Sequence, residues 1–207
     1  MNTPEAVACQ LKPVPGHPLL RVGRLLEPAA AAELMDGLLA EVVWNDGTYL
    51  VAGRSFSLPR LQAWYADPGI EYRYARQLLN SHPWSPILSA LRSQVEAVAG
   101  QAFNAVLVNL YRNGRDWVGW HADDEPDLGP APVIASLSLG ASRCLSVRAK
   151  GDDTRPEHAY PRVCLGAGEL LMMDAPFQRD WQHGVLADPA VDAPRMNLTF
   201  RRVVPSS

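Results

Sequence analysis

Cysteine is scarce in this chain. The 207 residues contain three cysteines, Cys9, Cys144 and Cys164, and none of them form a C-x-x-C pair. An odd count without that spacing indicates neither a disulfide framework nor a zinc site built from cysteine. Such cysteine usage is typical of a reducing compartment, so we expect a cytoplasmic protein.

Long apolar segments are also missing. No run approaches the roughly 18 apolar residues that a membrane-spanning helix requires. The residues Met1–Glu5 lack the basic and apolar regions of a signal peptide. Because 47% of the residues are hydrophobic, a chain of this length can bury a core without disulfides. We therefore expect a soluble, monomeric protein with one domain and no membrane contact.

Lysine is almost absent, and the charge is unevenly distributed. Only Lys12 and Lys150 accompany 17 arginines, and the net charge is -3. An acidic total argues against a protein that binds nucleic acid through bulk positive charge. However, residues 51–95 contain five arginines against two acids, a local charge of +3, whereas residues 1–50 contain three basic residues against six acids. Aromatic residues accompany these arginines, a combination suited to holding phosphates and stacking an extruded base.

The pattern of apolar residues predicts helices followed by strands. Spacing of leucine and valine predicts a helix over 28–43 and a second over 85–99, the latter with Ser85 as N-cap and Gly100 as its end. Residues 45–83 show no sustained periodicity. Short strands are predicted at 103–111, 133–139, 143–149, 169–173 and 195–204. This order predicts a β-sandwich or barrel with helices against one side.

A candidate metal site begins at His121-Ala122-Asp123. Residues two apart on an extended segment face the same side, so this imidazole and carboxylate converge. His183, which precedes the final predicted strand, is the best third ligand. Two histidines and one carboxylate are the ligand set of non-haem Fe(II) oxygenases. The same set could hold zinc in a hydrolytic site, and most His-x-Asp pairs are solvated loop residues.

The last predicted strand carries an unusual polar face. Arg195, Asn197, Thr199 and Arg201 alternate with apolar residues, and Asn109-Leu110-Tyr111 repeats the pattern on an earlier strand. Such a face ordinarily turns to water. If it instead faces into a barrel, its groups need partners, and two arginines with Asn and Tyr would suit a small dicarboxylate.

Taken in order, these residues resemble the AlkB-type Fe(II)/2-oxoglutarate dioxygenases, which oxidatively remove alkyl groups from nucleic acids. The resemblance covers roughly residues 50–204 and looks closest to the duplex-acting members. It rests on these segments: Pro59-Arg60, Tyr72-Arg73-Tyr74, Asn109-Leu110-Tyr111, His121 to Glu125, Ser136 to Gly140, Gly168 to Met173, His183, and Arg195 to Arg201.

The resemblance implies an α+β fold with a double-stranded β-helix (jelly-roll) core over 101–204, preceded by helices and a substrate lid within 1–100. It implies Fe(II), 2-oxoglutarate and dioxygen as cofactor and cosubstrates. His121, Asp123 and His183 would be the catalytic metal ligands. The 2-oxoglutarate pocket would contain Asn109, Tyr111, Arg195, Thr199 and Arg201, and which arginine meets which carboxylate stays open.

The implied substrate is alkylated DNA or RNA, demethylated at bases such as 1-methyladenine and 3-methylcytosine with release of formaldehyde and succinate. The candidate contacts are Val51, Ala52, Gly53, Arg60, Tyr72, Tyr74, Asp124 and Glu125. Duplex-acting relatives carry a bulky aromatic wedge where this chain has Ala52, which leaves the strand preference open. An acidic, solvated turn is the plain alternative for Asp124 and Glu125.

Several alternatives remain. The same cofactors could serve a protein, tRNA or small-molecule substrate, and a jelly-roll binding module could retain a vestigial metal site. A second basic group could add phosphate contacts or form an ordinary exposed hairpin: Arg143, Arg148, Lys150, Arg155 and Arg162. Trp117 and Trp120 depart from the family pattern, and we expect them in the pocket wall or the core.

Overall fold

The computed structural model describes residues 9–45, 47–51, 54–71, 73–74, 77–78 and 81–204. For residues 48–51, 54–56, 73–74 and 77–78 it describes the backbone alone. Ala52, Gly53 and Tyr72, three of the predicted substrate contacts, lie outside the described residues.

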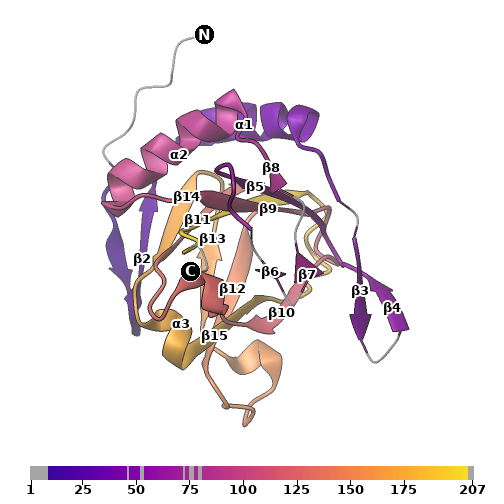
Figure 1. Ribbon diagram of the computed structural model, residues 1–207. Coiled ribbons are helices and arrows are strands. Elements are labelled where there is room, and N and C mark those ends of the chain that lie inside the picture. Colours follow the sequence, from indigo (N-terminus) through magenta and orange to yellow (C-terminus); the bar gives the residue numbers. More distant parts are fainter. Residues whose placement is uncertain are drawn as a thin grey trace.

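Two sheets face each other and form the jelly-roll core that the sequence predicts (Figure 1). The large sheet has the order β1 (Lys12–Val14), β2 (His17–Arg24), β14 (Glu169–Met173), β11 (Ile134–Gly140), β16 (Arg195–Arg201), β9 (Ala105–Tyr111), β5 (Leu61–Ala66), β8 (Ser81–His82). The small sheet has the order β10 (Val118–His121), β15 (Trp181–Val185), β12 (Arg143–Ala149), β13 (Arg162–Leu165). Two hairpins stand apart: β3 (Thr48–Val51) with β4 (Arg54–Ser57), and β6 (Arg73–Tyr74) with β7 (Gln77–Leu78).

Two helices cover the outer face of the large sheet, as predicted. They are α1 (Pro28–Glu41) and α2 (Pro86–Ala99), which lie side by side in Figure 1. The Ser85 hydroxyl accepts a hydrogen bond from the Leu88 amide, and Gly100 ends α2 in the left-handed conformation at φ 69°. A proline in the first turn and a glycine at the end define each limit of α2.

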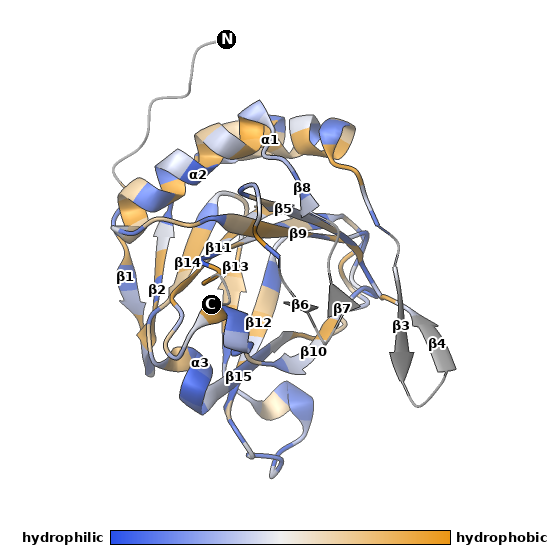
Figure 2. Cartoon of the chain, viewed as in Figure 1, coloured by the Kyte–Doolittle hydropathy of each residue, from blue (hydrophilic) through white to orange (hydrophobic). Residues whose placement is uncertain are grey.

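The helix layer explains why a polar strand face points inward. Met196, Leu198 and Phe200 of β16 join the hydrophobic cluster between the helices and the large sheet. Figure 2 shows the mostly apolar strands β9 and β14 in this layer. Because successive side chains alternate, the other face of β16, with Arg195 and Arg201, turns into the space between the two sheets. The default expectation of a solvated polar face is therefore wrong for this strand.

Several strands were not predicted. The proline-rich segment before α1 forms β1 and β2, and β2 pairs with β14, so strands precede the helices. Within 45–83, β5 pairs with β9 and lies next to the last strand of the large sheet, β8. Five of the six residues of β5 are buried, so both faces are covered and the alternation that identifies a strand is lost.

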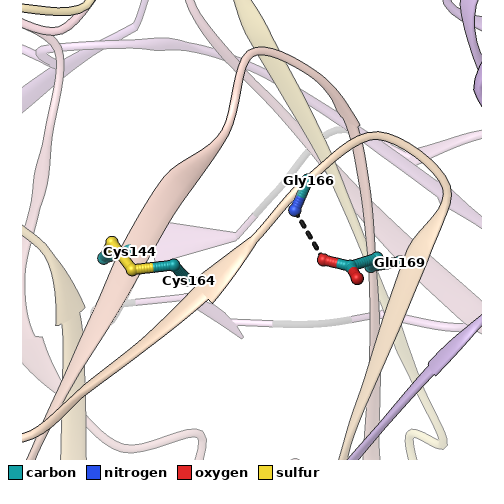
Figure 3. The surroundings of a disulfide bond; sticks show 4 residues. All are labelled: Cys144, Cys164, Gly166 and Glu169. Carbon is teal, nitrogen blue, oxygen red and sulfur yellow. Dashed lines mark hydrogen bonds between the residues drawn. A yellow bond between two sulfur atoms is a disulfide. The ribbon is translucent and has the colours of Figure 1, made fainter.

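A disulfide joins Cys144 to Cys164, which corrects the expectation from cysteine count (Figure 3). The two residues lie directly opposite each other in the antiparallel pair β12–β13. Cross-strand neighbours of this kind have Cβ atoms close enough to be bridged. The strand register creates this proximity, and cysteine number and spacing do not encode it.

Among the described residues, no helix has the length and apolarity that crossing a membrane requires.

Gly168 combines a left-handed backbone with a close contact to a neighbouring segment. Its φ is +79°, and an added Cβ would lie 2.0 Å from the carbonyl oxygen of Leu26. Gly151 has a similar φ of +80° but no atom within 4 Å of an added Cβ, so it is a matched control. We expect Gly151→Ala to lose about 1–2 kcal/mol from backbone strain, and Gly168→Ala to lose clearly more. Urea unfolding of both variants measures the difference, and equal losses would show that the close contact at Leu26 has no cost.

Candidate active site

A polar pocket of about 490 Å³, counting the space at its mouth, lies between the two sheets. Strands of both sheets contribute to its walls, together with residues of two loops. Its lining residues are Arg60, Leu107, Asn109, Tyr111, Val118, His121, Asp123, Ser136, Leu145, Leu165, Met173, His183, Val185, Arg195, Asn197, Thr199 and Arg201.

The structure brings together the three residues that the sequence predicts as metal ligands, in an arrangement that could hold a metal ion. Ligand atoms of His121, Asp123 and His183 all lie within 4.8 Å of one another. His121 and His183 are cross-strand partners in the β10–β15 pair, and their ring centroids are 4.3 Å apart. Asp123 follows β10 by two residues, so its carboxylate returns to the same point.

A β-bulge aims His121 into the pocket. Val118 pairs with Val185 and His121 with His183, so three steps along β10 match two along β15. The extra residue places both Val118 and His121 on the pocket side, which strict alternation would forbid. Nδ1 of His121 lies 2.8 Å from the carbonyl oxygen of Gly119. A carbonyl can only accept, so Nδ1 carries the proton and Nε2 keeps a lone pair for a metal.

The protonation states also suit a metal. Burial, together with the neighbouring charges of His121 and Arg201, outweighs the opposing charge of Asp123 and lowers the pKa of His183 to about 3. Burial alone would raise the pKa of Asp123, but the charges of Arg201, His183 and His121 outweigh it and hold that pKa at about 2. At neutral pH the site therefore offers neutral imidazoles and an ionised carboxylate, the forms that bind cations.

The two carboxylate oxygens of Asp123 have different surroundings. Oδ1 accepts a hydrogen bond from Nη2 of Arg201 at 2.5 Å. Oδ2 has no hydrogen-bond partner among the described residues, although it is buried, and it lies 3.8 Å from Nε2 of His183. A buried carboxylate oxygen without a donor is costly unless a cation meets it. The residues present therefore fit a divalent metal.

Arg195 marks the other end of the polar face of β16. Its side chain is buried, Nη2 donates to the Ser138 hydroxyl at 2.9 Å, and its guanidinium carbon lies 5.3 Å from the centre of the Tyr111 ring. Nε and Nη1 have no hydrogen-bond partner among the described residues. A buried guanidinium with two unmatched donors calls for an anion with two acceptors, which a carboxylate supplies.

The middle of the pocket is a hydrogen-bonded network. Asn197 donates to the Ser136 hydroxyl at 2.7 Å, and its oxygen accepts from the Thr199 hydroxyl at 2.9 Å. Asn109 accepts from Nε of Arg60 at 2.9 Å. All five residues predicted for 2-oxoglutarate line the pocket, and the two arginines separate into one beside the metal ligands and one beside Tyr111.

The predicted substrate contacts are more dispersed. Arg60 is 4% exposed and bonds Asn109 and the carbonyl oxygen of Trp117, so it lines the pocket and cannot reach a phosphate outside. Asp124 is exposed and pairs with Lys150 at 2.6 Å. Glu125 is half-buried beside it. For Val51 and Tyr74 only the backbone is described, in β3 and β6.

The two tryptophans near His121 lie outside the pocket. Trp117 is 41% exposed, so its expected place in the pocket wall or core is wrong. Trp120 is half-buried and stacks under the Arg148 guanidinium at 4.5 Å, and it is not a lining residue. For Trp120, the bulge in β10 removes the simple alternation from which the direction of the side chain would be inferred.

Two positioning residues escaped the sequence analysis. Gln178, from the short helix α3 (Phe177–Asp180), is 1% exposed, and its Oε1 accepts from the Asp123 amide at 3.0 Å. Ser138 orients Arg195. Glutamine and serine are common residue types, so neither position indicates a role in the site by sequence alone. For Ser138, its place as a polar residue among the apolar residues of β11 could have indicated one.

The fold and the pocket together define a jelly-roll protein with a two-histidine, one-carboxylate metal centre and a buried arginine for an anion. Comparison with known proteins names the class. Residues 20–201 match the family described as the 2OG-Fe(II) oxygenase superfamily. The chain therefore belongs to the 2OG-Fe(II) oxygenases, and within them to the AlkB-type proteins. Fe(II), 2-oxoglutarate and dioxygen are the cofactor and cosubstrates of this superfamily.

The similar proteins are of two kinds. The human Alpha-ketoglutarate-dependent dioxygenase alkB homolog 3 is 41% identical over 83% of this chain and 61% of its own length. The human DNA oxidative demethylase ALKBH2 is 40% identical over 87% of this chain and 71% of its own length. The chain thus spans about three fifths of the alkB homolog 3 proteins.

A solved structure supports the fold. The structure of OsALKBH1 superposes with a TM-score of 0.62 and covers 93% of this chain and 100% of its own, at 17% identity. At an identity this low, the similarity supports the fold and nothing further.

Arg195→Met tests the anion site. The variant removes a charged donor pair from a buried carboxylate, and such bonds contribute about 1.5–3 kcal/mol, so we expect the KM for 2-oxoglutarate to rise roughly 10- to 100-fold. Mn(II) affinity, measured by calorimetry, should stay unchanged. Arg202→Met, at an exposed residue that directly follows β16, is the control. An unchanged KM in Arg195→Met would refute the assignment.

Gln178→Leu tests how Asp123 is held. The substitution keeps the side-chain volume and removes the acceptor for the Asp123 amide. Loss of a hydrogen bond that orients a ligand typically lowers the metal affinity by about 10- to 100-fold. Calorimetric titration with Mn(II) measures the change. In Gln182→Leu, the lost amide instead contacts Arg148, so Mn(II) affinity should be retained. Equal Mn(II) affinities in Gln178→Leu and wild type would show that this hydrogen bond does not orient the ligand.

Proposed function

We propose that this protein is an Fe(II)/2-oxoglutarate-dependent dioxygenase that oxidatively demethylates N-alkylated bases in DNA or RNA, releasing formaldehyde and succinate. The observation that carries the proposal is one pocket with His121, Asp123 and His183 beside Arg201, and with Arg195 and Tyr111 beyond them. Identity of about 40% to an alkB homolog 3 protein and to ALKBH2, a DNA oxidative demethylase, supports the substrate class. We further propose that it acts as a monomer in the cytoplasm; the Cys144–Cys164 disulfide removes the support that cysteine usage gave to this location.

Different residues of the pocket bind the metal and the cosubstrate. His121, Asp123 and His183 hold the iron, which with 2-oxoglutarate and dioxygen supplies the oxidation. Arg201 keeps the Asp123 carboxylate ionised and fixed through Oδ1, which leaves Oδ2 for the iron. Arg195 and Tyr111 hold the distal carboxylate of 2-oxoglutarate. Orientation and the exclusion of water are the contributions of the protein to chemistry of this kind.

The charge near the iron site suits the proposed lesions. Bases methylated at N1 of adenine or N3 of cytosine are cationic at neutral pH, so they differ from normal bases in charge. Asp124 follows the ligand Asp123 directly and is exposed. A carboxylate there attracts a cationic base toward the pocket, and Lys150, its partner at 2.6 Å, sets the strength of that attraction.

The strand preference that we propose is for single strands, and it rests on the described arginines of the basic segment and on the identity of residue 52. Arg60 and Arg92 of the basic segment are occupied, by Asn109 and by Asp67 with Glu96. Fewer arginines are therefore free for phosphate than the sequence counts. Together with Ala52 in place of an aromatic wedge, this favours single-stranded substrates, from which a base is extruded at least cost.

A repair assay tests the function and the preference together. The protein is incubated with Fe(II), 2-oxoglutarate and oligonucleotides carrying 1-methyladenine or 3-methylcytosine, as single-stranded DNA, duplex DNA and RNA. We expect stoichiometric formaldehyde and restored bases, with single strands repaired at least about tenfold faster than duplex because the duplex adds an unpairing cost of a few kcal/mol. Ala52→Phe should narrow this ratio. Succinate formation without restored base on any strand would overturn the proposed substrate.

A further inference from the structure

Arg143 occupies a position that the basic composition of its hairpin does not reveal. It begins β12 and is 3% exposed. Nη1 donates to the carbonyl oxygen of Asn113 at 3.2 Å, and Nη2 donates to those of Asp116 at 3.0 Å and Leu186 at 2.6 Å. A side chain so enclosed by backbone acceptors cannot present its charge to a phosphate.

These three acceptors flank the strands that carry the histidine ligands. Asn113 and Asp116 lie in the loop that leads into β10, and Leu186 follows β15 directly. At this end of the strand pair, Val118 is opposite Val185. The Arg143 guanidinium therefore links the loop before β10 to the residue that follows β15 through hydrogen bonds.

The same guanidinium lies beside the distal end of the pocket. Its carbon is 5.7 Å from the centre of the Tyr111 ring, and that of Arg195 is 5.3 Å from it. The acceptors of Arg143 are backbone carbonyls and that of Arg195 is a hydroxyl, so neither hydrogen-bonds a carboxylate. The charge of Arg143 adds to burial in lowering the pKa of Arg195.

Two buried cations around one ring create a positive potential that a bound anion relieves. Coulomb attraction at short range is strong where water is excluded. A 2-oxo acid with a distal carboxylate places its second charge at this end, whereas a monocarboxylate leaves the end empty.

We propose that Arg143 is a positioning residue for 2-oxoglutarate, which holds Tyr111 and the ends of β10 and β15 in place and adds attraction for the distal carboxylate. It is not a nucleic-acid contact. This inference rests on the proposed cosubstrate and not on the proposed base substrate.

The test compares two 2-oxo acids by calorimetry on the Mn(II)-loaded protein without nucleic acid. Arg143→Met should weaken 2-oxoglutarate binding about tenfold, as expected for the loss of one nearby buried charge. It should change the Kd of 2-oxobutyrate, which lacks the distal carboxylate, less than twofold. Arg143→Lys retains the charge without the planar fork, so we expect an intermediate loss of roughly threefold.

Arg162→Met is the matched control, because Arg162 lies exposed on β13 in the same hairpin. We expect it to leave both 2-oxo acids unaffected. Oligonucleotide binding should keep its affinity and salt dependence in both Arg143 variants. Thermal unfolding identifies a variant that fails to fold, and the decision then rests on Arg143→Lys.

Two results would overturn the inference. In one, 2-oxoglutarate and 2-oxobutyrate weaken by the same factor, which indicates general disruption. In the other, 2-oxoglutarate affinity is unchanged while oligonucleotide affinity and its salt dependence fall, which indicates a phosphate contact. A wild-type protein that binds 2-oxoglutarate but restores no methylated base would overturn the proposed substrate and leave the inference on Arg143 standing.

Discussion

The ion pair between Asp123 and Arg201 is the interaction on which the site depends. Both side chains are almost completely buried, and Oδ1 of Asp123 meets Nη2 of Arg201 at 2.5 Å. A buried carboxylate without a cation would take up a proton and lose its value as a ligand. Arg201 prevents this, and because it uses one oxygen only, the other remains directed at His183. The two imidazoles can then share one cation with Asp123 without being protonated themselves.

This arrangement requires a fold that can turn a polar strand face inward. The jelly roll does so by covering the apolar face of β16 with two helices, so that Met196, Leu198 and Phe200 supply the hydrophobic burial. The opposite face then lines a space that a second sheet closes. Its polar groups are partly matched by Ser136 and Ser138, and Arg195 keeps two donors that have no hydrogen-bond partner in the described part of the chain. The cost of those donors is offset when an anion binds, which couples the stability of the pocket to its cosubstrate.

The pairing of His121 with Asp123 and the helices could be predicted because each depends on local spacing, whereas the inward direction of the polar face of β16 followed from the family resemblance and not from its spacing. His121 and Asp123 are two residues apart, Ser85 and Gly100 frame a helix, and β16 alternates strictly. Features set by strand register could not be predicted. The Cys144–Cys164 disulfide, the β-bulge in β10 and the burial of Arg143 all arise where distant segments pair. Composition counted Arg143 and Arg60 among charges for nucleic acid, yet the structure places both inside.

The most direct test of the central claim is the anomalous scattering of a crystal grown with Mn(II) and 2-oxoglutarate. We expect one strong peak bonded to His121, Asp123 and His183 at roughly 2.0–2.3 Å, the range of nitrogen and oxygen ligands. We also expect 2-oxoglutarate density with its distal carboxylate on Arg195 and Tyr111. A peak that lacks any one of the three ligands, or a distal carboxylate placed on Arg201, would contradict the central claim.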